Sequence, residues 1–225
     1  MALSSRNLLL ALGAVVIVAA GGIYYFVNQP EASAIPASGA GAPAPLADSE
    51  LMVAGPLGEK ALGDPNAKVT VIEYASMTCS HCSHFHETTF TPFKEKYVDT
   101  GKVRFIFREF PFDPVATSAF MLARCAPGDA YFPMVDLLFR QQKTWAFSDR
   151  PADGLFNIVK QAGFTQESFK ACLTNQSILD GVNWVKNRAS EKFGVSSTPT
   201  FFINGEMQSG ALTLEELDKQ IEPLL

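Results

Sequence analysis

The stretch Val69-Thr-Val-Ile-Glu-Tyr-Ala-Ser-Met-Thr-Cys-Ser-His-Cys82 decides how this chain folds. Its first half, residues 69–75, is β-branched and aromatic, which is typical of a buried strand. Beyond it, residues on one face recur at helical spacing, at Cys82, Phe85, Thr89, Phe93 and Tyr97. The stretch therefore predicts a buried strand that runs into a helix, with two cysteines at the junction.

The rest of the chain adds strands on both sides of a long helical block. The expected elements are strands at 103–108, 200–203 and near Met207, a helical block at about 113–193 and a last helix at 212–221. Asn204-Gly205 is a strong hairpin signal between the last two strands. Because strand, helix and strand follow one another first, we predict an α/β fold with a parallel strand pair, interrupted by the helical block.

The cysteine pair forms a C-x-x-C motif, Cys79 and Cys82, at the start of the predicted helix. Three residues of separation in a first helical turn bring two sulfurs within bonding range. Unpaired N–H groups and partial positive charge at the helix N-terminus lower the pKa of Cys79 and favour its thiolate. His81 adds a side chain that can be cationic or donate a hydrogen bond to that thiolate. The motif therefore predicts a redox-active pair.

A metal site is the main alternative for these cysteines. All three histidines lie beside the pair, and Cys79, Cys82 and His86 would share one helix face. No second C-x-x-C motif completes a structural zinc site. We therefore expect no bound metal, and we interpret His84 and His86 as solvated helix residues.

Two further features lie close to the cysteines in the predicted fold. Glu73 is an acid inside an otherwise apolar strand, and on its own we expect it at a solvent-facing edge. If buried beneath the cysteines, it would suit proton transfer to or from Cys82. Thr198-Pro199 directly precedes the strand at 200–203, and a proline in such a place is ordinarily only part of a turn.

The N-terminal 61 residues are expected to stand apart from a folded domain at 62–225. Arg6 precedes 20 uncharged residues, 8–27, which have the length of a membrane-spanning helix. A small-residue site at Ala32-Ser33-Ala34 leaves a removed signal peptide as the alternative. Either outcome exports the remainder of the chain. Residues 28–61 are rich in Ala, Pro, Gly and Ser, which predicts a flexible linker.

The composition limits the remaining possibilities. The chain has 225 residues, 47% of them hydrophobic, which is enough for one good-sized domain with a packed core. A net charge of −5 without a basic run offers no electrostatic footprint for nucleic acid. Cys125 and Cys172 both lie in the helical block. For an exported chain we favour a structural disulfide between them over two buried thiols.

Three separated motifs together resemble the DsbA-like thiol–disulfide oxidoreductases of the thioredoxin superfamily. They are the segments 71–82, 110–112 and 195–205. The resemblance implies a thioredoxin fold with an inserted helical domain at about 113–193. It implies that Cys79 is the exposed nucleophile and Cys82 its buried partner. It further implies a cis-proline at Pro199 packed against the pair, Thr198 in contact with disulfide and substrate backbone, and a buried acid at Glu73.

The same resemblance implies an activity and its partners. The Cys79–Cys82 disulfide would be donated to reduced, newly exported proteins, in the periplasm or at the outer face of the cell membrane. A membrane reoxidase of the DsbB or VKOR type would restore it, and the protein would act as a monomer without a cofactor. His81 favours this oxidase direction over a reductase or isomerase of the same fold. Ser80 stands where the family often has proline, so the reduction potential stays open.

Overall fold

A computed structural model of the protein describes residues 48–225. The strands are β1 (Lys60–Leu62), β2 (Val69–Ala75), β3 (Val103–Glu109), β4 (Thr200–Ile203) and β5 (Glu206–Ser209). The helices are α2 (Asp48–Leu51), α3 (Ser80–Phe85), α4 (Thr91–Phe93), α5 (Pro114–Arg124), α6 (Tyr131–Arg140), α7 (Gln142–Trp145), α8 (Pro151–Val159), α9 (Gln166–Leu173), α10 (Gln176–Phe193) and α11 (Leu214–Ile221). Two π-helical stretches, η1 (His86–Phe90) and η2 (Lys94–Val98), flank α4, and 3-10 turns η3 (Lys160–Ala162) and η4 (Glu222–Leu224) follow α8 and α11.

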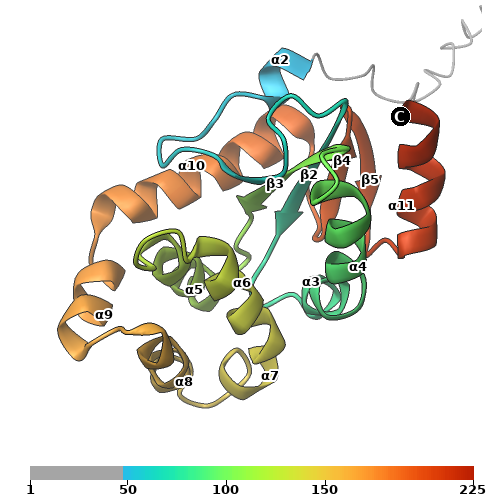
Figure 1. Ribbon diagram of the computed structural model, residues 1–225. Helices are drawn as coiled ribbons and strands as arrows, with labels where there is room; N and C mark the ends of the chain where they lie inside the picture. The colour runs from blue at the N-terminus through green and yellow to red at the C-terminus, as the bar shows by residue number, and fades with distance from the viewer. Residues whose placement is uncertain (1–47) are drawn as a thin grey trace, which may run out of the picture. The chain divides into compact units, whose positions relative to one another are not determined.

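The strands form a single sheet in the order β1-β3-β2-β4-β5. The central strand β2 runs parallel to β3 and antiparallel to β4, and β5 closes a hairpin with β4. Helix α3 and the π-helical stretches after it connect β2 to β3, which makes the predicted βαβ unit. Helices α5 to α10 follow between β3 and β4 (Figure 1). The α/β fold with a helical insertion predicted from the sequence is therefore confirmed.

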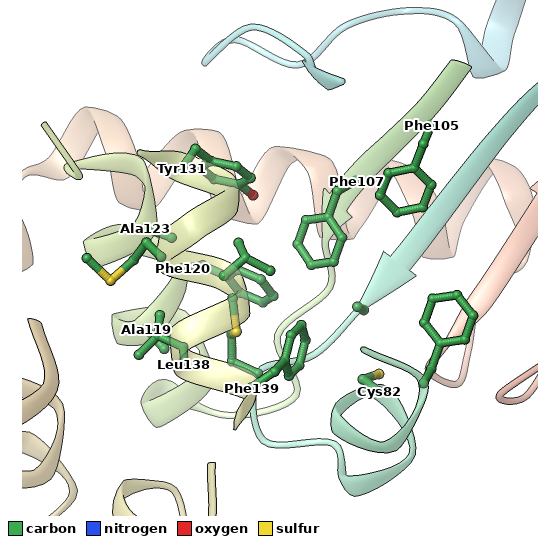
Figure 2. Packing of buried hydrophobic residues seen from close by; sticks show 14 of the residues in the cluster. Cys82, Phe105, Phe107, Ala119, Phe120, Ala123, Tyr131, Leu138 and Phe139 are labelled. Carbon is green, nitrogen blue, oxygen red and sulfur yellow. The ribbon is translucent and has the colours of Figure 1, made fainter. Parts of the chain in front are cut away.

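The two faces of the sheet carry separate apolar clusters. Successive side chains of a strand point to opposite faces. Val71 and Ala75 of β2 belong to the cluster that also contains Cys82 of α3, whereas Ile72 and Tyr74 pack with residues of α10. Glu73 lies two residues from Val71 and two from Ala75, so its side chain points to the same face of the sheet, which α3 covers. Figure 2 shows this face, with Phe107 and Phe139 directed toward one another and Cys82 nearby.

The prediction of a flexible linker at 28–61 is wrong for residues 48–61, the part of it that the structure describes. Residues 48–51 form α2, and β1 joins the sheet antiparallel to β3, with Lys60 opposite Phe107. Leu51 is 2% exposed in the cluster on the α10 face of the sheet. Leu57 lies against Gly181 of α10 so closely that a Cβ there would meet the leucine side chain. The high content of Ala, Pro and Gly indicated a linker, but these two leucines give the segment enough apolar surface to pack.

Two buried arginines of the domain also hold this segment. Arg108 of β3 pairs with Glu59 at 2.7 Å and donates to the hydroxyl of Tyr74. Arg124 of α5 donates to the carbonyl oxygens of Leu57 and Gly58 at 3.1 and 3.0 Å. Buried guanidinium groups need such partners, because burying an unpaired charge costs several kcal/mol. The segment is therefore part of the folded domain.

The expected anchor or signal peptide at 8–27 and residues 28–47 of the expected linker lie outside the described residues. Within residues 48–225, no helix combines the length and apolar character needed to cross a membrane.

Candidate active site

Cys79 and Cys82 lie where the central strand passes into its helix. Cys79 occupies the N-cap of α3 with an extended backbone, and the Ser83 N–H donates to its carbonyl oxygen at 3.1 Å. The Cys79 N–H in turn donates to Ser76 O at 3.1 Å, which fixes the turn after β2. Both cysteines are free thiols; Cys79 is partly exposed and Cys82 is 0% exposed. A partner can therefore reach Cys79 but not Cys82.

Hydrogen bonds lower the pKa of Cys79 to about 5. The largest contribution is the hydrogen bond from the Cys82 thiol, and burial of Cys79 opposes it. The Thr198 side chain and the backbone N–H groups of Cys82 and His81 lower the pKa further. These N–H groups belong to the first turn of α3, where helical N–H groups have no partner within the helix. Cys79 is therefore a thiolate at neutral pH.

The pKa of Cys82 moves in the opposite direction, well above its usual value. Burial is the main cause, since a charged sulfur is poorly solvated there. The hydrogen bond to Cys79 and the negative charges of Cys79 and Glu73 raise it further. The reduced site is therefore a thiolate at Cys79 beside a thiol at Cys82.

The loop before β4 faces the exposed cysteine. The Thr198–Pro199 peptide bond is cis, and Cys79 Sγ lies 3.3 Å from Thr198 O, to which it donates a hydrogen bond when it is protonated. The Thr198 hydroxyl is buried without a hydrogen-bond partner among residues 48–225, and it lowers the pKa of both Cys79 and Cys82. Pro199 O accepts a hydrogen bond from Gly210 N at 2.9 Å, which ties the loop to the end of the hairpin. Thr198 and Pro199 thus line the approach to Cys79.

Glu73 is buried beneath the cysteines, and the solvent-facing edge expected from the sequence alone is wrong. Its carboxylate is 0% exposed, on the face of β2 that α3 covers. His86 Nε2 lies 3.0 Å from Oε2 and 3.2 Å from Oε1 of Glu73. His86 is 3% exposed, so its interpretation as a solvated residue is also wrong, whereas His84 is exposed as expected. The acid and the histidine form a buried pair.

His81 contributes to the site differently from what its position between the cysteines suggests. Its side chain is exposed and makes no hydrogen bond with any residue in the range 48–225. Its backbone N–H, rather than its imidazole, lowers the pKa of Cys79. His81 therefore stabilises the thiolate through its backbone, which a residue of another type at this position would also provide.

The helical insertion reaches the active-site loop through two side chains that the sequence did not single out. Gln142 of α7 is 2% exposed, and its Nε2 donates to Met77 O at 2.8 Å and Cys79 O at 3.0 Å. Asp113, the N-cap of α5, accepts a hydrogen bond from the Thr78 hydroxyl at 2.6 Å. A glutamine inside a helical block carries no signal of this role, because its partner carbonyls lie more than sixty residues away.

The other two cysteines are joined to each other. Cys125, at the end of α5, forms a disulfide with Cys172 of α9 across a sequence separation of 47 residues. In the chain-entropy account a loop of this length contributes about 4 kcal/mol at most. The bridge ties two helices of the insertion together, and neither cysteine belongs to the site at α3.

No metal ligand set is assembled in the part of the chain that the structure describes. Within 48–225, no three residues among His, Cys, Asp and Glu are placed to hold an ion together. The histidine proposed as a ligand, His86, instead bonds Glu73.

Comparison with known proteins identifies a family model and relatives that match this chain. A family model described as thioredoxin matches residues 57–223. A Rickettsia felis chain that carries the name of a protein-disulfide oxidoreductase is 34% identical over 170 residues, which are 73% of this chain and 59% of that relative. The chain thus spans less than two thirds of the length of this relative.

Solved structures agree with that assignment. The crystal structure of Wolbachia pipientis alpha-DsbA1 is 34% identical, with a TM-score of 0.72 over 79% of this chain and 96% of that one. A protein-disulfide isomerase from Novosphingobium aromaticivorans is 25% identical, with a TM-score of 0.64 over 76% of this chain and 98% of that one. The chain therefore belongs to the thioredoxin superfamily, as a DsbA-like member with a helical insertion.

Proposed function

We propose that this protein is a thiol–disulfide oxidoreductase that donates the Cys79–Cys82 disulfide to reduced, exported proteins. The observation that carries the proposal is the opposite shift of the two cysteine pKa values. A stabilised Cys79 thiolate stabilises the reduced enzyme, which makes the disulfide a better oxidant. A pKa of about 5 lies between ~7 for thioredoxin and ~3.5 for DsbA. This intermediate pKa supports oxidation of partners as the direction of exchange.

The proposed reaction has two exchange steps. A substrate thiolate attacks Cys79 Sγ, the Cys79–Cys82 bond breaks, and Cys82 leaves and takes up a proton. A second substrate thiolate then attacks the substrate sulfur of the mixed disulfide, and Cys79 leaves as a stable thiolate. The substrate gains one disulfide and the enzyme two reduced cysteines. The two substrate thiols release two protons, of which Cys82 binds one and solvent takes the other.

The neighbouring residues have proposed roles in these steps. Thr198 stabilises the Cys79 thiolate and, with Pro199, presents backbone to the substrate. Glu73 serves as the acid or base for Cys82, whose pKa its charge raises. His81 is exposed beside Cys79, where its side chain meets whichever partner approaches the site.

The partners and location remain part of the proposal. The uncharged stretch at residues 8–27 supports export to the periplasm or the outer face of the cell membrane, through or anchored by that stretch. A membrane reoxidase of the DsbB or VKOR type would restore the disulfide. We expect the protein to act as a monomer without a cofactor.

Trapping of mixed disulfides tests the exchange reaction. In a Cys82→Ala variant the second cysteine cannot release a bound partner, so exported proteins should accumulate as adducts of Cys79. A Cys79→Ser, Cys82→Ala variant is the matched control. Recovery of equal amounts of adduct from both variants, or of none, would rule out exchange at this site.

Equilibration with glutathione tests the direction. We expect a reduction potential between about −270 mV, the value of thioredoxin, and about −120 mV, the value of DsbA. A potential at or below that of thioredoxin would reject the oxidase role and favour a reductase of the same fold.

A further inference from the structure

Glu73 is a carboxylate enclosed by protein on every side. It is 0% exposed, and the sole side chain that hydrogen-bonds it among residues 48–225 is His86. Its cross-strand neighbours are Phe107 on β3 and Phe201 on β4, which offer neither charge nor proton. His86 is therefore the hydrogen-bonded neighbour through which a proton can reach this carboxylate.

His86 is built into this place by its own helix. It follows Cys82 by four residues, so both side chains lie on one helical face. A π-helical stretch begins at His86, and such irregular turns are frequent at functional sites. The imidazole stacks on Phe139 of α6, with ring centroids 4.5 Å apart and planes 21° apart, and meets the edge of Phe107. The ring is therefore held with its Nε2 toward Glu73.

Cys82 needs a proton that bulk water cannot easily supply. It is 0% exposed, and burial raises its pKa, so it leaves the disulfide as a poorly solvated thiolate. Glu73 lies close enough for its charge to disfavour that thiolate. His86 keeps 3% of its surface exposed and is the member of the group with access to solvent, since Cys82 and Glu73 have none.

We propose that His86 is the proton-relay residue of the dithiol site and acts on Cys82 through Glu73. When Cys82 leaves the disulfide, the proton shared by Glu73 and His86 passes from the Glu73 carboxyl to Cys82 Sγ, which leaves a carboxylate beside a neutral imidazole. Solvent then returns a proton to His86. When the disulfide forms again, Cys82 gives its proton back along the same path. The imidazole of His86 hydrogen-bonds Glu73 and neither cysteine, so it positions and recharges Glu73.

Other charged groups near the ring are already engaged. On its own helix, Glu87 accepts a hydrogen bond from the Ser83 hydroxyl, and His84 is exposed. On α6, Asp136 and Arg140 pair with each other at the surface. β3 presents Phe107 to the ring, and α4 has no titratable side chain. Within residues 48–225, the titratable group that faces the His86 ring without another side-chain partner is therefore Glu73, and the two cysteines lie beyond it.

Single-turnover kinetics test the relay, with His86→Gln as the main variant. Oxidised enzyme is mixed with a reduced dithiol peptide, and the appearance of the Cys79 thiolate is followed by its ultraviolet absorbance across pH 5–8. We expect His86→Gln to slow the step on the order of tenfold, less than the ~100-fold typical of losing a direct acid. A His84→Gln variant, which changes an exposed histidine close to His86, is the matched control and should keep the wild-type rate. Wild-type rates in His86→Gln would overturn the proposal.

A double-mutant cycle separates a relay from two independent effects. If His86 acts through Glu73, a Glu73→Gln variant should be at least as slow as His86→Gln, and the double variant no slower than Glu73→Gln. Losses that multiply would reject a shared path. The proposal rests on disulfide exchange at this site and not on its direction. A thioredoxin-like potential would therefore reject the oxidase role and leave the relay intact.

A measurement on the unmodified protein covers the case in which the variants do not fold. The chain has three histidines, so their ring nitrogens can be assigned by NMR in the full-length protein. We expect the His86 ring signals to differ between the oxidised and reduced forms, while those of His84 do not. Identical His86 signals in both forms at every pH would overturn the proposal.

Discussion

The side-chain amide of Gln142 donates a hydrogen bond to the carbonyl oxygen of Cys79 at 3.0 Å. The same nitrogen donates to Met77 O at 2.8 Å, so one buried side chain of the insertion holds both ends of the turn that presents the reactive cysteine. Asp113 holds the residue between them, Thr78, at 2.6 Å. The insertion is therefore a structural support of the active-site turn as well as an added layer of helices.

Replacing Gln142 with alanine should weaken both the fold and the thiolate. The change leaves Met77 O buried without its donor, and we expect a loss of about 2 to 3 kcal/mol in the free energy of unfolding. Because the turn loosens around the N-cap, the pKa of Cys79 should also rise. Urea unfolding and a pH titration of the thiolate absorbance measure the two effects. The neighbour Gln141→Ala is the control, and equal effects of the two variants would argue against this role.

Breaking the ion pair of Glu59 should show that residues 48–61 belong to the domain. Arg108 is nearly buried, and Glu59→Ala leaves it with the Tyr74 hydroxyl as its remaining partner. We expect a loss of about 3 kcal/mol, at the lower end of what an orphaned buried charge costs. Asp136→Ala, which breaks the exposed pair with Arg140, should change stability by less than about 1 kcal/mol. Urea unfolding measures both losses. An equally small loss in the free energy of unfolding for Glu59→Ala and Asp136→Ala would mean that Glu59 does not stabilise buried Arg108.

The sequence predicted the sheet and the insertion because their signals are local. Apolar runs such as 69–75 and 103–108 mark strands by their own composition, and the C-x-x-C motif sits directly behind one of them. Local composition did not predict the structure of residues 48–61, because their ordered conformation depends on distant partners. Leu51, Leu57 and Glu59 stand among Ala, Pro and Gly, and nothing nearby shows that α10, Arg108 and Arg124 complete them.

The same distinction separates the parts of the site that were predicted from those that were missed. Cys79 and Cys82 follow from spacing, and the resemblance added the burial of Glu73 and the cis bond at Pro199. His86 was assigned to solvent because the helical period alone does not show which face meets Glu73 thirteen residues earlier. Its burial follows from the π-helical stretch and from Phe139, a residue of the insertion.

The two redox forms should differ in how their stability depends on pH. The pKa of Cys79 is about 5 in the folded reduced protein and about 8.5 when unfolded. The unfolded chain therefore binds more protons between these values, and the stability of the reduced form should rise with pH across that window and be lost as pH falls through 5. Cys82 has the opposite sign, because its folded pKa is raised; above about pH 8.5 it should lower stability.

Urea unfolding of both redox forms from pH 5 to 9 checks this dependence. The oxidised form has no titrating thiols in the site, so the difference between the two curves isolates the cysteines. A Cys79→Ser variant, reduced, should lose the rise between pH 5 and 8. A flat difference between the oxidised and reduced wild type would contradict a lowered Cys79 pKa.

Removing the Thr198 hydroxyl should raise the pKa of Cys79 and make the disulfide a weaker oxidant. Thr198→Val keeps the shape of the side chain and removes a buried hydroxyl that lowers the pKa of Cys79 and of Cys82. Because a less stable thiolate means a less stable reduced form, the reduction potential should become more negative together with the rise in pKa. Thr200→Val is the control, since the Thr200 hydroxyl donates to Ser197 O instead. If both variants shift the pKa and the potential equally, the effect comes from the loop backbone and not from a hydroxyl at the sulfur.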